Sequence, residues 1–140
     1  MKENFKILAE YIKDMSSETP NIETYIFVKD NISKYHLNID INSIPLKNKL
    51  IEINTKKKFE DKGLNDKKSH FEIVYASIIR VEDDIKEKKD LEKIILCDVQ
   101  NKIYPNLEKA FLNLLANSGY PNIKLEKKID FEKLYNDRSN

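Results

Sequence analysis

The side chains that could perform acid–base, nucleophilic or metal chemistry are few and scattered along this sequence. The segment YIKDMSSETPN, residues 11–21, holds two acids, Asp14 and Glu18, and no residue that would make a catalytic pair with either. Two histidines and one cysteine cannot build a zinc-binding pattern. The single cysteine, Cys97, lies far in sequence from both histidines, and we expect it to be a buried helix residue instead of a nucleophile.

Phosphate chemistry is equally unsupported. Only Gly63 and Gly119 are glycines, so the sequence holds no glycine-rich loop that could cradle a phosphate. The many acids leave a carboxylate dyad open, but none sits in an apolar context that would shift its pKa. We therefore expect no enzyme, no cofactor and no metal.

Length and charge describe a soluble chain of one domain, residues 1–140. The net charge of +1 argues against a nucleic-acid-binding protein, which usually carries a basic excess. No apolar run of about 18 residues is present and the N-terminus does not resemble a signal peptide, so we expect no membrane insertion. The lone cysteine agrees with a reducing, cytoplasmic location. The basic run at residues 56–58 is expected to be a solvated strand end or hairpin tip.

Alternating apolar residues predict strands in the first half. Residues 5–13 alternate, and the turn residues that follow, at 16–21, are expected to end this strand. Residues 24–30 are irregular and stay unassigned. Residues 35–42 give the clearest strand, because Tyr35, Leu37, Ile39 and Ile41 alternate with polar residues.

Two further strands are predicted at residues 49–59 and 69–81, joined by a hairpin connection at residues 61–68. The last of these strands is apolar on both faces. An antiparallel sheet usually leaves one face in water, so a second apolar face needs a cover. Helices of the same chain or another subunit could supply it.

The second half is helical. Apolar residues at helical spacing run from Leu91 to Ile103, and Pro105 is expected to interrupt the helix. A second helical stretch follows and stops at Gly119, and Asp130 is expected to cap a short last helix. Strands first and helices afterwards predict an α+β fold, with the helices segregated from an antiparallel sheet.

Several segments, taken in order, resemble the SecB family of protein-export chaperones. The segment at residues 11–21 resembles the family pattern Y-x-K-D-[IL]-S-F-E-x-P-N, and FVKD at residues 27–30 resembles F-x-K-D-W. Residues 71–79 resemble x-E-[VI]-x-Y-x-G-[IV]-F. Residues 103–135 resemble LFPYARE followed, after a gap, by RGxFPxLxLxPVNFDALY. The chain departs from these patterns at Ser77, where the family has glycine, and at Ser118, where it has arginine.

The resemblance implies an α+β subunit with a four-stranded antiparallel sheet, assembled as a homotetramer that is a dimer of dimers. Such a protein binds unfolded precursor proteins in apolar grooves and delivers them to the SecA motor ATPase for export. On this resemblance we expect three sets of site residues: Tyr35, Leu37 and Ile39 in a client-binding groove; Asp14, Glu18 and Glu72 docking SecA; and Phe71, Ile73 and Tyr75 in the oligomer interface.

Two other functions stay open at this point. One is a SecB-like chaperone dedicated to a toxin–antitoxin system. The other is a small-ligand carrier or enzyme that uses a cavity of the α+β fold.

Overall fold

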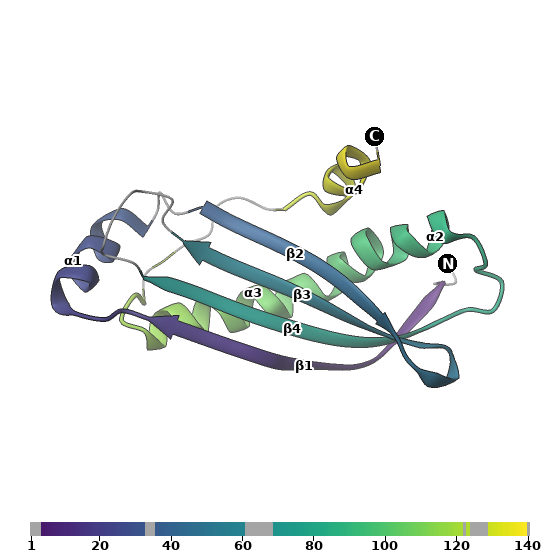
Figure 1. Ribbon diagram of the computed structural model, residues 1–140, viewed down its shortest axis with the longest axis horizontal. Helices are drawn as coiled ribbons and strands as arrows, with labels where there is room; N and C mark the ends of the chain where they lie inside the picture. Colours follow the sequence, from purple (N-terminus) through teal and green to yellow (C-terminus); the bar gives the residue numbers. More distant parts are fainter. Residues whose placement is uncertain (1–3, 33–35, 61–68, 122, 124–128, 140) are drawn as a thin grey trace.

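The computed structural model describes residues 4–32, 36–60, 69–121, 123 and 129–139. Strands β1 (Phe5–Glu18), β2 (His36–Pro45), β3 (Leu50–Glu60) and β4 (His70–Val81) form one antiparallel sheet in the order β1-β4-β3-β2. Helix α1 (Ile22–Asn31) lies between β1 and β2 in sequence, and a 3₁₀ turn, η2 (Lys47–Lys49), joins β2 to β3. Helix α3 (Val99–Asn117) lies along one face of the sheet, and α4 (Phe131–Ser139) lies beyond β2 (Figure 1). The predicted α+β class and four-stranded sheet are confirmed.

Strand β1 is longer than predicted, and two irregularities along it change which residues point toward α3. It pairs with β4 as far as Glu18, beyond the expected end at the turn residues. Register shifts occur between Ile7 and Ala9 and between Ile12 and Asp14. Each extra residue reverses the faces of those that follow, so the simple alternation assumed for residues 5–13 is wrong. Ile12 consequently lies opposite Tyr75, on the side of the sheet that α3 covers.

The unassigned residues 24–30 belong to helix α1. Asn21 caps the N-terminus of the helix, because its side-chain oxygen accepts a hydrogen bond from the Thr24 amide at 2.8 Å. Val28 and Thr24 are its buried residues, which is why apolar periodicity gave only a weak signal there.

The long helix is not interrupted at Pro105. A short helix, α2 (Lys88–Lys93), continues through a π-helical turn, η3 (Ile94–Asp98), into α3, and Pro105 lies inside α3. Proline removes one helical N–H, whose acceptor would be the carbonyl of Asn101. Both residues are exposed, so water can satisfy that carbonyl. The prediction of a break at Pro105 is therefore wrong, whereas buried Cys97 lies on the helix as expected.

Both predicted helix signals near the C-terminus are confirmed. Gly119 has φ 106°, and the amides of Gly119 and Tyr120 bond back to the carbonyls of Ala116 and Leu115 at 3.1 and 2.9 Å. This pair of bonds is a Schellman motif, which favours glycine at its left-handed position. Asp130 caps α4, because its carboxylate accepts from the Lys133 amide at 3.0 Å.

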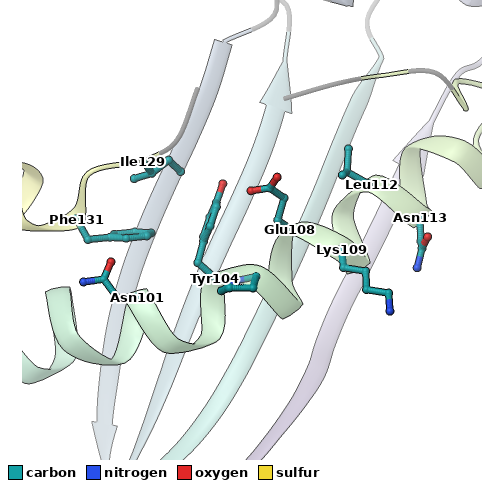
Figure 2. A pocket seen from close by; sticks show the side chains of 9 residues that line it. Asn101, Tyr104, Glu108, Lys109, Leu112, Asn113, Ile129 and Phe131 are labelled. Atoms are coloured by element: carbon teal, nitrogen blue, oxygen red, sulfur yellow. The ribbon is translucent and has the colours of Figure 1, made fainter. Parts of the chain in front are cut away.

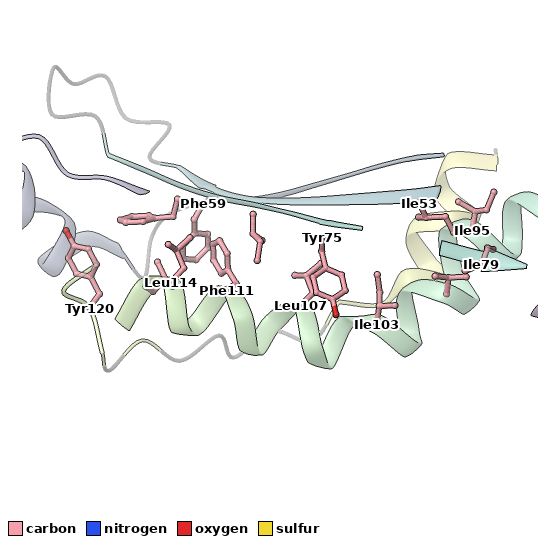
Figure 3. Packing of buried hydrophobic residues seen from close by; sticks show 14 of the residues in the cluster. Ile53, Phe59, Tyr75, Ile79, Ile95, Ile103, Leu107, Phe111, Leu114 and Tyr120 are labelled. Atoms are coloured by element: carbon pink, nitrogen blue, oxygen red, sulfur yellow. The ribbon is translucent and has the colours of Figure 1, made fainter. Parts of the chain in front are cut away.

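The main core lies between the sheet and α3 (Figure 3). Ile103, Leu107 and Phe111 from the helix are fully buried against the sheet. One polar pair lies within this layer, where the Thr55 hydroxyl donates to Gln100 Oε1 at 2.9 Å. The sheet contributes apolar residues that alternate along the central strands: Ile53, Phe59, Phe71, Ile73, Tyr75 and Ile79.

Lys57 is a charged residue that lies buried among the apolar residues of this core. It points to the helix face of β3 and has no exposed surface, so the expectation that residues 56–58 are a solvated strand end is wrong for it. Its ammonium donates to the Tyr104 hydroxyl at 2.6 Å and lies over the rings of Tyr104 and Phe111, 4.7 and 5.1 Å from their centroids. Burial lowers the pKa of Lys57 to about 8, and the negative charge of Glu108 partly opposes this shift.

The depressed pKa predicts that Lys57 costs stability at neutral pH. The unfolded chain keeps the lysine proton up to about pH 10.5, whereas the folded chain releases it near pH 8. The unfolded state therefore binds more protons between these values, and stability rises with pH across this window. We expect Lys57→Met to raise the free energy of unfolding by about 1–3 kcal/mol at pH 7.

Urea denaturation of the wild type and the variant at pH 7 and at pH 10 measures this difference. The advantage of the variant should shrink at the higher pH, and Lys6→Met, at an exposed position of β1, should show neither effect. A variant that is no more stable than the wild type at pH 7 would show that the buried ammonium is fully compensated by its contacts.

Candidate functional site

Two neighbouring hollows flank Phe131, the first residue of α4. The larger has a volume of about 590 Å³ and lies between one flank of α3 and the residues that lead into α4 (Figure 2). The smaller has a volume of about 260 Å³ and lies between β2, η3 and α4. Both hollows touch Phe131, and the two together are called the groove below. The larger hollow is lined by Asn101, Tyr104, Pro105, Glu108, Lys109, Leu112, Asn113, Ile129 and Phe131, and the smaller by Ile39, Asp40, Ile41, Leu96, Phe131, Leu134 and Tyr135.

Helix α3 supplies one wall of the larger hollow through residues spaced four apart. Tyr104, Glu108 and Leu112 follow one another on the same flank of the helix, each half-buried. Their neighbours one position back, such as Ile103 and Leu107, point into the main core. The helix therefore builds the core with one face and the groove wall with the adjacent flank.

Helix α4 supplies the other wall and is held in place by a small second core. Phe131 and Tyr135 are 2% and 8% exposed and pack with Cys97. The ring of Phe131 meets that of Tyr104 edge-on, with centroids 5.3 Å apart. The Tyr135 hydroxyl donates to the Lys89 carbonyl at 3.4 Å. Phe131 thus lines both hollows, and its packing against Tyr104 and Cys97 holds it in place.

Polar groups line the larger hollow at several positions, and Tyr104 and Glu108 are the half-buried ones among them. The hydroxyl of Tyr104 and the carboxylate of Glu108 point to the same side of α3, and Ile129 and Phe131 lie across from Tyr104 (Figure 2). Burial, followed by the charge of Glu108, raises the pKa of Tyr104, so its hydroxyl stays protonated at physiological pH. Lys57 lies behind Tyr104 and away from the hollow.

The expected groove residues are only partly placed here. Ile39 lines the smaller hollow, and Leu37, on the same face of β2, packs against the main core. Tyr35 lies outside the residues that the structure describes. Sequence reasoning did not assign Tyr104, Leu112 or Phe131 to the site. A usable signal existed in the last helix, where Phe131, Leu134 and Tyr135 are the apolar residues among charged ones.

The three acids expected to dock SecA lie on the opposite, open face of the sheet. In the pairing of β1 with β4, Asp14 lies opposite Val74, Glu72 opposite Ser16, and Glu18 opposite His70. Side chains at such alternate positions share one face of a sheet. Glu72 therefore lies diagonally between Asp14 and Glu18, and diagonal neighbours are about 7–8 Å apart.

This acidic group is partly neutralised by Lys56. The Lys56 ammonium lies 3.1 Å from the Glu72 carboxylate, whose side chain is 16% exposed. The bond to Glu72 raises the pKa of Lys56, and the charges of Asp40 and Asp14 raise it further. Asp14 and Glu18 remain exposed to solvent.

The predicted oligomer interface is wrong. Phe71, Ile73 and Tyr75 are 0%, 0% and 7% exposed within a single subunit, because they form the β4 part of the core beneath α3. They cannot contact a second subunit without unfolding the first. Uncovered apolar side chains lie instead along β1, where Leu8, Ile12 and Met15 are between 41% and 47% exposed.

The described residues show no helix long and apolar enough to cross a membrane. Among the same residues, no three His, Cys, Asp or Glu side chains are grouped closely enough to hold a metal ion. What the site offers is an apolar groove with a few polar atoms, together with a charged face on the other side of the sheet.

Comparisons with known proteins agree on one family. A family model described as preprotein translocase subunit SecB matches residues 1–140. A putative protein-export protein SecB of Pelagibacter ubique is 62% identical over 140 residues and covers all of both chains. A protein-export protein SecB of Xanthobacter autotrophicus is 25% identical, over 96% of this chain and 85% of its own.

The fold is shared with a solved structure of low sequence identity. The SecB-like chaperone of Mycobacterium tuberculosis, in complex with a peptide from an antitoxin, matches with a TM-score of 0.64 at 9% identity, over 90% of this chain and 91% of its own. The α+β subunit, its apolar groove and the match along the whole sequence lead to one conclusion: the chain belongs to the SecB family of protein-export chaperones.

Proposed function

We propose that this export chaperone holds unfolded precursor proteins in the groove that flanks Phe131 and passes them to the SecA motor ATPase through the open face of its sheet. It acts in the cytoplasm as a homotetramer, a dimer of dimers, and hydrolyses nothing itself. The observation that carries the proposal is the groove. Its two hollows have volumes of about 590 and 260 Å³, both touch Phe131, and more of their lining residues are apolar than charged.

The groove suits a client that has not folded. An unfolded chain exposes apolar side chains, and their burial between α3 and α4 is favourable whatever the sequence. Burying one leucine-sized side chain is worth about 1.5–3 kcal/mol. Several grooves on one oligomer would hold a long client more tightly than one groove, because each later contact is intramolecular. Binding the unfolded client also keeps it from folding by mass action.

The M. tuberculosis relative supports peptide binding on this fold, since it was solved with an antitoxin peptide. That structure also keeps a second candidate function in view, a chaperone dedicated to a toxin–antitoxin pair. We favour general export because the relative at 62% identity carries the protein-export name. An adjacent gene pair encoding a toxin and an aggregation-prone antitoxin would favour the second function.

Groove variants test client binding. Leu112→Asp combined with Leu134→Asp places one charge in each hollow at half-buried or exposed positions. We expect at least a 10-fold loss of affinity for an unfolded precursor, because each variant replaces a leucine-sized contact. Light scattering of an aggregating precursor, with and without chaperone, gives the readout.

The matched control is Ile26→Asp, which introduces the same charge at an apolar residue of α1 that is 54% exposed and lines neither hollow. If the double variant still suppresses aggregation as well as the wild type does, clients bind elsewhere.

Charge reversal tests the docking face. Asp14→Lys combined with Glu72→Lys should weaken SecA binding by about 10-fold or more at low salt, because like charges would then face a basic partner. Client binding should be unchanged, since both residues lie on the face of the sheet opposite the groove. Glu23→Lys with Asp30→Lys, two exposed acids of α1, makes the same change in net charge elsewhere. Equal losses in the two double variants would mean that only net charge matters.

The exposed apolar side chains of β1 are the surface we propose for assembly. An edge strand that shows apolar residues in water invites pairing with a second copy. Ile12→Glu should therefore reduce the mass measured by size exclusion with light scattering, while Ile22→Glu, at a residue of α1 that is 64% exposed, should not. A wild type that is already monomeric at micromolar concentration would refute the homotetramer.

A further inference from the structure

The buried ammonium of Lys57 has contacts that point to a role in the groove. A lysine has three N–H donors and no acceptor, so in the 2.6 Å contact Lys57 donates and the Tyr104 oxygen accepts. The rest of the ammonium faces the rings of Tyr104 and Phe111, which attract it as cation–π partners. Its position is therefore fixed from more than one side.

This contact directs the proton of Tyr104. The Lys57 ammonium donates to one lone pair of the Tyr104 hydroxyl oxygen, so the hydroxyl proton must point in another direction. Tyr104 lines the larger hollow, and no acceptor within the described part of the chain takes that proton. The raised pKa of Tyr104 keeps the proton in place. Tyr104 is thus a hydrogen-bond donor in the wall of the hollow, and the contact with Lys57 restricts the orientation of its proton.

Glu108 supplies an acceptor one helical turn away. It lines the same hollow, and among the described residues no cation lies within ion-pair distance of its carboxylate. Figure 2 shows that both side chains extend to the same side of α3, and the charge of Glu108 contributes to the raised pKa of Tyr104. Leu112, Ile129 and Phe131 provide apolar surface around the pair. A donor and an acceptor one helical turn apart on the wall of the same hollow match the carbonyl and the N–H of an extended peptide, both of which must be paired when they leave water.

We propose that Tyr104 and Glu108 bind the main chain of the client, the hydroxyl donating to a peptide carbonyl and the carboxylate accepting from a peptide N–H. Lys57 is a positioning residue that keeps the Tyr104 proton turned toward the client. The inference rests on the proposed client groove and deepens it. Main-chain bonds are available on every unfolded sequence, so this pair would add affinity without adding sequence preference.

The test uses two fluorescent peptides of the same apolar sequence. One has ordinary amide bonds, and the other has ester bonds at alternate positions, which remove N–H groups and weaken the adjoining carbonyls as acceptors. Fluorescence anisotropy gives the affinity of each. We expect the wild type to prefer the amide peptide by about 5- to 10-fold, since one or two hydrogen bonds are lost in the ester peptide.

Variants then show which residues cause the preference for the amide peptide over the ester peptide. Tyr104→Phe, which keeps the ring, should bind the amide peptide about 3- to 10-fold more weakly and lose most of the preference. Lys57→Met should reduce the preference although it leaves Tyr104 in place, which a purely structural role of the lysine would not do. Tyr25→Phe is the matched control, because its hydroxyl bonds to the Gly119 carbonyl at 3.1 Å, outside the groove. Thermal melts confirm that each variant is folded.

The outcomes separate this inference from the proposed function. If the wild type binds neither peptide, both fail. If it binds the two peptides equally, or if Tyr104→Phe keeps the full preference, the groove remains a client site but the main-chain role is refuted. Glu108→Leu tests the role of the carboxylate separately. If this variant loses affinity only for peptides that contain lysine, Glu108 binds cationic side chains of the client, and its proposed role toward the main chain is refuted.

Discussion

The packing of one long helix on a four-stranded sheet is the interaction on which the rest of the molecule depends. Helix α3 buries Ile103, Leu107 and Phe111 against the two central strands, β3 and β4. A helix is about 10 Å wide, and four strands span roughly twice that distance. A single helix therefore cannot cover all four strands along their whole length, so parts of the outer strands β1 and β2 lie beyond α3. On the β2 side, α4 returns to cover Ile39 and Ile41 and leaves the groove between itself and α3. On the β1 side, within the described residues, no element covers Ile12 and Met15, which remain exposed.

The open face of the sheet shows why β4 can be apolar on both sides without a second helix. Tyr11 and Lys13 reach from β1 to Glu52 on β3, with contacts of 3.0 and 3.1 Å, across the β4 strand that separates them. The small Ala76 lies opposite Tyr11 and has no exposed surface. The long side chains of Tyr11, Lys13 and Glu52 thus cover small apolar residues of β4 such as Ala76. This face of the sheet therefore keeps a charged outer surface while the small apolar residues of β4 are shielded from water.

Much of the fold could be predicted from the sequence because its strongest signals are local. The alternation in residues 35–42, the glycine at 119 and the cap at Asp130 each reflect a backbone requirement that a few neighbouring residues satisfy. The predictions of secondary structure were wrong where contacts with residues distant in sequence determine the local conformation. The bulges in β1 follow from its pairing with β4, and Pro105 is tolerated because its side of α3 faces solvent. The site was harder to predict, because the groove is made by three segments far apart in sequence, although Ile39 does line the smaller hollow. Phe71, Ile73 and Tyr75 were expected in an interface because apolarity alone does not distinguish a core from a contact surface.

The burial of Lys57 was also not predictable from neighbouring residues. It further shows how a residue that lowers stability can serve the proposed function. A basic run of three residues predicts solvated side chains, yet alternation on a strand forces its middle member to the buried face. An ammonium at that position lowers stability at neutral pH, since burial lowers its pKa to about 8. A methionine would fill the same space without this cost. Local rules that a folded protein breaks are most often broken where it binds or reacts. Because Tyr104 is both the hydrogen-bond partner of Lys57 and part of the groove wall, this cost in stability is incurred next to the position where we propose that an unfolded client pairs its main chain.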